Sequence, residues 1–331
     1  MKNFISFSSS LILLLAVAST LGYAPSQYST SYLDQSCHDN IPAVLKKNAE
    51  LSTLLDLVTK AGLADTLSGP GSFTVFAPTD EAFASIDSQT LKYILDNVEL
   101  LKDILTYHVV AFEISPAYLS SIKHVYQFPT VQGAAPIRIN VYREKGSITP
   151  FDTIKKVTIN GALVLTALKA CNGYVYVIDK ILNPKDLMPE NDELEIFKRN
   201  DLTIVKRIFD ALGFTPVNIF FRPETIFAPT DAAFAALPSG FLESLLADKK
   251  KLFEVIRNHI VTGYQYSRGL ETGPILTISG AIVDVKVSPN GITYGGANVI
   301  IPDLTNVQGV IHIIDAVILT DSQLPSINKK Y

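Results

Sequence analysis

The sequence predicts an α+β fold that occurs twice in the chain. The first observation is a repeated phrase: FTVFAPTDEAF at residues 73–83 returns as ETIFAPTDAAF at residues 224–234. The two phrases lie 151 residues apart, and the same offset aligns His108 with His259. The units of a solenoid are much shorter, roughly 20–50 residues. The long period therefore indicates that a whole domain has been duplicated.

The second observation is a helical pattern at the start of each copy. Apolar residues at positions i, i+3, i+4 and i+7 from Leu51 to Val58 predict an amphipathic helix that ends at Gly62. The second copy repeats this pattern from Leu202 to Gly213. We therefore expect each domain to begin with helices.

The third observation is a change of period later in each copy. Apolar and polar residues alternate along 137–142 and along 283–287, which predicts strands with one buried face. Alternating valines or isoleucines at 175–177 and 311–313 predict the last strands. Each copy is thus expected to be an α+β domain, with a sheet and with helices segregated to one side of it.

The expected organisation of the chain follows from its ends and its linker. Residues 1–24 combine a basic start with a short apolar run, which predicts a secretory signal peptide cleaved near residue 18 or 24; a buried N-terminal helix is the alternative. The C-terminus lacks the hydrophobic tail of a lipid anchor, so we expect a protein secreted to the extracellular space or matrix, with no membrane anchor. The expected boundaries are a signal peptide at 1–24, a flexible lead-in at 25–37, domain one at 38–185, a linker at 186–192, domain two at 193–322 and a tail at 323–331.

Composition and motifs exclude several functions. The formal net charge is −4 at pH 7, whereas nucleic-acid binders carry clustered basic surface, so no nucleic-acid partner is expected. The sequence has no Gly-x-Ser-x-Gly, His-Glu-x-x-His, Walker or dinucleotide-binding motif. Its five histidines show no local metal-ligand spacing. We expect neither an enzyme, nor a cofactor, nor a metal site.

The two cysteines, Cys37 and Cys171, both lie in the first copy. In an oxidising compartment this arrangement predicts one disulfide bond within domain one. On the chain-entropy model, closing so long a loop would contribute roughly 4–5 kcal/mol. Two buried free thiols, or an intermolecular bridge from Cys37, remain alternatives.

Three sequence blocks, in the same order in both copies, carry a family resemblance. They are FAPTDxAF, a histidine after a Leu/Ile-rich helix, and a last block that reads NGYVYVID in the first copy and QGVIHIID in the second. Together they resemble the fasciclin domain, and the resemblance covers nearly all of the expected mature chain. It implies two tandem fasciclin-like domains, each a β-strand wedge or sandwich with helices packed at one end. Family members are secreted or surface-anchored adhesion and matrix proteins, and several contact integrins.

The resemblance also implies candidate receptor-binding residues. Asp303 and Leu304 stand where the family has an Asp-Ile pair linked to receptor contact, and an exposed carboxylate can complete the coordination of a receptor-bound cation. Tyr107 and His108 match a Tyr-His motif, and we expect Tyr107 to be exposed. The alternative for Asp303 is that it caps a turn after Pro302.

The remaining candidates have structural roles. A histidine that recurs at one position in both copies is expected to be a buried hydrogen-bonding residue, and this applies to His108 and His259. Their expected partners are the threonine and aspartate of the repeated phrase, which are also natural helix N-caps. These residues are Thr79, Asp80, Thr230 and Asp231.

Three classes of function remain. The first is an adhesion or matrix protein that binds an integrin-type cell-surface receptor or extracellular matrix polymers. The second is a secreted carrier of a small hydrophobic ligand. The third is a structural matrix component that self-associates.

Overall fold

The structure is a computed structural model, and it describes residues 39–123, 125–144, 154–188, 191–213, 223–320 and 323. These residues belong to one compact unit. The predicted signal peptide and lead-in lie outside the described residues, as does nearly all of the predicted tail. Among the residues described, no helix has the length and apolar character needed to cross a membrane.

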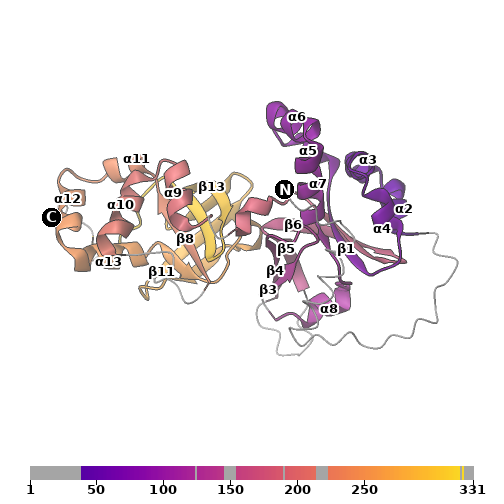
Figure 1. Cartoon of the computed structure of the whole chain (residues 1–331). Coiled ribbons are helices and arrows are strands. Elements are labelled where there is room, and N and C mark those ends of the chain that lie inside the picture. Colours follow the sequence, from indigo (N-terminus) through magenta and orange to yellow (C-terminus); the bar gives the residue numbers. More distant parts are fainter. Residues whose placement is uncertain are drawn as a thin grey trace. The chain divides into compact units, whose positions relative to one another are not determined.

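The first copy contains a seven-stranded sheet in the order β2-β1-β7-β6-β5-β4-β3. Figure 1 labels β1, β3, β4, β5 and β6 of this sheet. Strands β1 and β7 pair in parallel, and the other neighbours pair antiparallel. The strands are β1 (Phe73–Pro78), β2 (Val109–Val110), β3 (Val125–Pro129), β4 (Pro136–Arg143), β5 (Ile154–Ile159), β6 (Ala162–Ala170) and β7 (Gly173–Ile178).

Helices precede and follow β1 in the chain. They are α2 (Ile41–Lys47), the 3-10 helix η1 (Ala49–Leu51), α3 (Ser52–Lys60), α4 (Ala64–Ser68), α5 (Asp80–Ala84), α6 (Ser88–Asp96), α7 (Val98–Tyr107) and α8 (Pro116–Ser121).

The second copy repeats this arrangement, with the strand order β10-β11-β12-β13-β14-β8-β9. Figure 1 labels β8, β11 and β13 of this sheet. Its strands are β8 (Glu224–Pro229), β9 (Ile260–Thr262), β10 (Gly273–Leu276), β11 (Ile282–Ser288), β12 (Gly291–Tyr294), β13 (Ala297–Thr305) and β14 (Gly309–Ile314). Its helices are α9 (Glu193–Arg199), α10 (Thr203–Leu212), α11 (Asp231–Ala235), α12 (Phe241–Ala247), α13 (Lys249–Arg257) and η3 (Ser267–Gly269). The 3-10 helix η2 (Pro184–Leu187) lies between the two copies, and its Leu187 packs in the core of the first. The predicted α+β fold in two copies is confirmed.

The central strands are buried on both faces because a hydrophobic cluster lies on each side of the sheet. Along β7, Val175 and Val177 join the cluster beneath the helices, whereas Tyr176 and Ile178 join the cluster on the opposite face. This division follows from the two-residue period of a strand, which sends successive side chains to opposite faces.

The repeated phrase fixes the starts of two helices in the first copy. Thr79 caps α5, because its hydroxyl accepts a hydrogen bond from the backbone N–H of Ala82 at 3.1 Å. The carboxylate of Asp80 binds the start of α3, where it accepts from Ser52 Oγ at 2.7 Å and from the backbone N–H of Thr53 at 2.8 Å. These contacts satisfy donors that every helix leaves unpaired at its N-terminus.

The second copy uses the same two residues in the same way. Thr230 caps α11 through the backbone N–H of Ala233, at 3.0 Å. Asp231 accepts from Thr203 Oγ1 and, at 2.9 Å, from the backbone N–H of Ile204 at the start of α10. The Thr-Asp pair therefore joins each central strand to two helices, which gives a structural reason for the repetition.

Candidate functional site

His108 and His259 are buried at equivalent positions, as predicted. Nδ1 of His108 donates to the carbonyl of Ile104 at 2.8 Å, and Nε2 accepts from the backbone N–H of Leu182 at 2.9 Å. His259 makes the same two kinds of contact at its own site. Burial lowers the pKa of both imidazoles to about 4, so both rings are neutral at physiological pH.

The partners that the sequence predicts for these histidines are wrong. Thr79, Asp80, Thr230 and Asp231 bind helix N-termini instead, as described above. Helix N-termini offer several unpaired N–H donors, which an aspartate or threonine satisfies more directly than a single imidazole does. The histidine ring nitrogens bind backbone groups.

Tyr107 is fully buried, so the prediction that it is exposed is wrong. Its hydroxyl donates to the carbonyl of Pro136 at 2.8 Å and accepts from Asn160 Nδ2 at 2.9 Å. Tyr107 is the last residue of α7, and its ring lies in the cluster on the far side of the sheet from the helices. The residue links α7 to β4 and to the turn between β5 and β6, and it offers no surface to a partner in this conformation.

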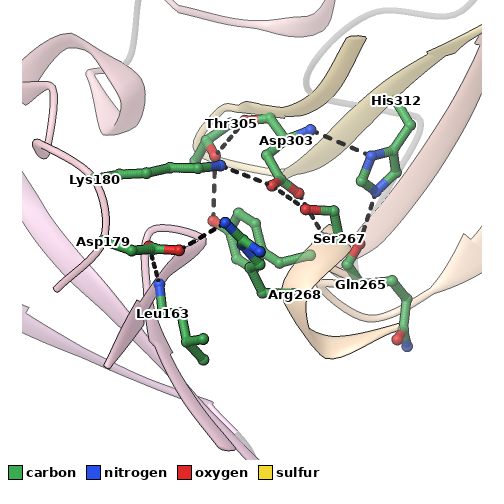
Figure 2. Close-up of polar contacts among 10 residues, drawn as sticks. Leu163, Asp179, Lys180, Gln265, Ser267, Arg268, Asp303, Thr305 and His312 are labelled. Atoms are coloured by element: carbon green, nitrogen blue, oxygen red, sulfur yellow. Dashed lines mark hydrogen bonds and ion pairs between the residues drawn. The ribbon is translucent and has the colours of Figure 1, made fainter. Parts of the chain in front are cut away.

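Asp303 lies in β13 at a place where the pairing with β14 shifts, and its φ is +64°. Its carboxylate is 5% exposed. One oxygen accepts from the backbone N–H of Ser267 at 2.7 Å, and the other accepts from Ser267 Oγ and from Lys180 Nζ, the latter at 3.2 Å (Figure 2). The neighbouring Leu304 packs against the core of the second domain. The receptor role of Asp303 and Leu304 stays a prediction.

His312, which sequence reasoning did not single out, supports this conformation of Asp303. The imidazole is fully buried and stacks on Phe227 with 5.0 Å between ring centroids. Nε2 donates to the carbonyl of Gln265 at 2.7 Å, which leaves Nδ1 as the acceptor for the backbone N–H of Asp303 at 3.2 Å (Figure 2).

Two ion pairs at this site join the first domain to the second. Lys180 and Asp179 follow β7, and they bind Asp303 and Arg268 respectively, the second pair at 2.9 Å (Figure 2). Asp179 also accepts from the backbone N–H of Leu163 at 2.7 Å, which holds it in place. Asp303, the acidic residue at the position of the family motif, therefore takes part in a contact between the two domains.

Arg138 on β4 is fully buried and makes several hydrogen bonds to the second domain. Its Nη2 donates to the carbonyls of Asn306 and Val307, each at 2.9 Å, and its Nη1 donates to the hydroxyl of Tyr266 at 3.1 Å. The guanidinium also lies over the ring of Tyr264, 3.7 Å from its centroid. A planar group with five donors suits such a set of carbonyl and aromatic partners.

The sequence pattern placed Arg138 and Asn140 on the polar face of their strand, which is correct. It missed that the second domain covers this face: Asn140 Nδ2 donates to the carbonyl of Tyr264 at 3.1 Å. Close approach is possible because Gly269 has no side chain; a Cβ there would lie 2.1 Å from the ring of Tyr142. Gly161 of the first domain has the same role, since a Cβ there would lie 2.6 Å from the ring of Tyr266.

Both domains expose an apolar side chain at the same position. Leu165 on β6 and Ile300 on β13 are 51% and 50% exposed, and they are equivalent in the alignment of the two copies. Each lies where the pairing of its strand with the next one shifts, between Val164 and Thr166 in the first domain. A β-bulge changes the direction in which the side chain at that position points. We name Leu165 and Ile300 the bulge residues.

Cys171 is not a free thiol. Its predicted partner, Cys37, lies outside the described residues, so the disulfide stays a prediction.

Comparison with known proteins gives matches over most of the chain. The fasciclin domain model matches residues 49–184 and 202–320. Human periostin is 29% identical over 269 residues, which cover 78% of this chain and 30% of periostin. Pig transforming growth factor-beta-induced protein ig-h3 is 29% identical over 267 residues, which cover 78% of this chain and 36% of ig-h3. The chain thus spans about a third of the length of these relatives.

A bacterial relative and a solved structure are also similar. Immunogenic protein MPB70 of Mycobacterium bovis is 34% identical over 151 residues, which cover 44% of this chain and 69% of MPB70. The FAS1 domain pair of the insect cell adhesion molecule fasciclin I covers 84% of this chain and all of its own, with a TM-score of 0.39 and 20% identity.

Proposed function

Because the chain belongs to the fasciclin-domain family, we propose that it is a secreted adhesion or matrix protein that binds cell-surface receptors or matrix polymers. The observation that carries this proposal is that the family match accounts for both domains, and the family is one of adhesion and matrix proteins. The proposal includes an integrin-type receptor as a partner, a disulfide bond between Cys37 and Cys171, and no catalytic activity.

The bulge residues are the contact surface that we favour for a partner. Asp303 and Tyr107 are engaged inside the protein, whereas Leu165 and Ile300 expose about half of their surface. Ile300 lies on the same strand as Asp303, so the segment that resembles the family motif does reach solvent, through a different side chain. Exposed apolar side chains at matching places in both domains suit a partner that contacts each domain alike.

The test is attachment of cells to the purified protein coated on plastic, with and without EDTA. We expect the double variant Leu165→Ser, Ile300→Ser to reduce attachment at an unchanged thermal midpoint. The matched control is Ile282→Ser, which removes a 71% exposed apolar side chain from β11 and should leave attachment unchanged. Equal attachment of the wild type and the double variant would reject this surface, and no attachment of any cell type would reject the adhesion proposal.

A second candidate function, the carrier of a small hydrophobic ligand, rests on a small apolar pocket in the first domain. Leu57, Phe83 and Leu105 line it together with Ile94 of α6, and α6 has no buried residue. Native mass spectrometry of protein from its own source would show bound mass if a ligand enters beneath α6. A clean mass of the protein alone would count against a carrier.

The third candidate, a self-associating matrix component, is tested by sedimentation velocity at micromolar concentration. Oligomers would support it, and a strict monomer would contradict it.

A further inference from the structure

The sequence contains three Asn-Gly pairs, and the structure places them in different surroundings. They are Asn160-Gly161, Asn172-Gly173 and Asn290-Gly291. In such a pair the backbone nitrogen of the glycine can attack the side-chain amide carbon of the asparagine, because glycine has no side chain to obstruct the approach. The attack has to bring these two atoms together, so it depends on how firmly the asparagine side chain is held. The adhesion proposal uses none of the three pairs.

Asn160, in the turn between β5 and β6, is buried and held by two hydrogen bonds. Its Oδ1 accepts from the backbone N–H of Arg138 at 2.7 Å, and its Nδ2 donates to the hydroxyl of Tyr107 at 2.9 Å. The second domain covers the following glycine, since a Cβ on Gly161 would lie 2.6 Å from the ring of Tyr266. The side chain of Asn160 is therefore fixed away from its glycine while both domains are folded.

Asn172, in the turn between β6 and β7, is buried and held in a similar way. Its Oδ1 accepts from the backbone N–H of Ile41 at 3.0 Å, and its Nδ2 donates to the carbonyl of Leu67 at 2.8 Å. Gly173 is the first residue of β7, and a Cβ there would lie 1.8 Å from the carbonyl oxygen of Phe73 on β1. A reaction at this pair would require the first domain to open.

Asn290 differs from both, because it is exposed at the tip of the hairpin of β11 and β12. Ser288 and Gly291 form the last pair of this hairpin, so Pro289 and Asn290 make a two-residue turn. The backbone N–H of Asn290 donates to Ser288 Oγ at 3.3 Å, whereas its side-chain amide makes no hydrogen bond to any described residue. A Cβ on Gly291 would meet nothing within 4 Å, so the space beside the glycine is open.

The pair at 290–291 comes from the shortening of the second copy. In the first copy the equivalent strands, β4 and β5, are separated by residues 144–153, whereas only Pro289 and Asn290 separate β11 from β12. Proline in second place and glycine in fourth place are typical of a type I turn, and asparagine is a common turn residue. Gly291 has a φ of +126°, which other residues adopt rarely. The turn thus needs its glycine, and the glycine follows an asparagine.

We propose that Asn290 is a site of spontaneous deamidation in the folded protein. The backbone nitrogen of Gly291 forms a bond to Cγ of Asn290, the bond from Cγ to Nδ2 breaks, and ammonia leaves with the proton of the backbone nitrogen. The product is a five-membered succinimide ring. Water then opens the ring at one carbonyl to give aspartate, or at the other to give isoaspartate, in which the main chain runs through Cγ. The reaction needs only water and local opening of the turn.

Deamidation would change the hairpin in two ways. Both products add a negative charge at its tip, and isoaspartate also adds one carbon atom to the main chain. The length of a hairpin loop sets the register of its strands, so the added atom disturbs the pair Ser288–Gly291. The next pair is Val287 with Ile292, and Ile292 packs against the core of the second domain. A chain that has existed for a long time therefore differs from a new one in the charge and the pairing of this hairpin.

The test is peptide mapping by mass spectrometry of the full mature chain, sampled during several weeks at neutral pH. Deamidation raises the mass of a peptide by about 1 Da, and chromatography separates the isoaspartate form from the aspartate form. We expect the initial rate at Asn290 to exceed the rate at Asn160 or Asn172 by at least about 100-fold, because the buried pairs react only when their surroundings open. In concentrated urea, which removes burial, the three rates should be comparable.

Asn290→Gln is the control variant, because a glutamine would have to form a six-membered ring and reacts far more slowly. It should remove the mass increase of the peptide that contains residue 290. It should also slow the drift of the folded protein toward lower isoelectric point, since each deamidation adds one negative charge. The rates at Asn160 and Asn172 in this variant should equal those of the wild type.

Two results would overturn the proposal. If Asn290 stays intact in the folded protein but reacts in urea, the turn keeps the glycine nitrogen away from the side chain. If all three asparagines react at the same rate in the folded protein, global unfolding controls the reaction and the exposed turn does not. Neither result depends on cell attachment, so this proposal and the adhesion proposal can fail separately.

Discussion

The guanidinium of Arg138 lies over the ring of Tyr264, 3.7 Å from its centroid, although the two residues belong to different domains. The same guanidinium donates to the carbonyls of Asn306 and Val307. One side chain of the first domain thus satisfies backbone acceptors of the second and packs against one of its aromatic rings. Substitutions of Arg138, Gly269, Asp303 and Ser267 test this contact and the residues around it.

Arg138→Lys should lower the free energy of unfolding by about 2–4 kcal/mol, because an ammonium cannot reach the same acceptors in a plane and leaves buried carbonyls unpaired. Urea unfolding measures this change. Lys286→Met, on the exposed side of β11, is the control and should change the free energy by less than about 0.5 kcal/mol. If both variants behave alike, Arg138 does not hold the domains together.

Gly269→Ala should separate the domains, because the new Cβ would lie 2.1 Å from the ring of Tyr142. We expect a larger radius of gyration in small-angle X-ray scattering and faster proteolysis between the domains. Gly69→Ala is the control, since its Cβ would meet only ordinary contacts, the nearest at 3.4 Å. Adding Tyr142→Ala to Gly269→Ala should restore the compact form; a compact single variant would show that the ring simply moves aside.

Asp303→Ala and Ser267→Ala separate the structural role of Asp303 from a receptor role. Ser267→Ala removes only the bond from the Ser267 hydroxyl to Asp303. Asp303→Ala removes this bond, the bond from the backbone N–H of Ser267 and the ion pair with Lys180. We expect Asp303→Ala to lower the free energy of unfolding by about 1–3 kcal/mol and to affect cell attachment no more than Ser267→Ala does. A loss of attachment in Asp303→Ala alone, at matched stability, would restore the receptor role.

The buried histidines should make both domains sensitive to acid. The folded-state pKa of His108 and His259 is about 4, below the ordinary value of 6.5, so the unfolded chain binds protons first as the pH falls. Each histidine therefore reduces stability as the pH falls from about 6.5 to 4, by at most about 1.4 kcal/mol per pH unit.

Urea midpoints measured across this range, for the wild type and for His108→Gln, His259→Gln, isolate the effect of the histidines. The comparison with the variant is needed because the raised pKa of Glu224 has the opposite effect: it makes the folded state more stable as the pH falls below about 8. The variant should lose less stability on acidification than the wild type. Equal slopes would mean that the rings are protonated in the folded state.

The sequence predicts the fold well because a pattern found in one copy can be compared with the same positions of the other copy. A phrase that occurs twice at a fixed offset marks residues that the fold requires, and Thr79 and Asp80 indeed hold two helices at their starts. Tyr107 shows where this reasoning ends. It is the last residue of α7, and no pattern in the sequence reveals that its ring joins the cluster on the far face of the sheet.

Sequence patterns do not reveal the residues that join the two domains, for a different reason. Alternation along β4 tells which face is polar, but not that another domain covers that face and turns Arg138 into a buried residue. Differences between the copies are the more useful signal here. Glu224, for example, stands where the first copy has Phe73.

The polar character of the interdomain contact has a consequence for how the chain is made. The first domain leaves the ribosome before the second exists, and the strand face that will later be covered then carries Arg138 and Asn140, which water solvates well. An apolar face in the same place would invite aggregation during this interval. The domains can therefore fold one after the other and dock last.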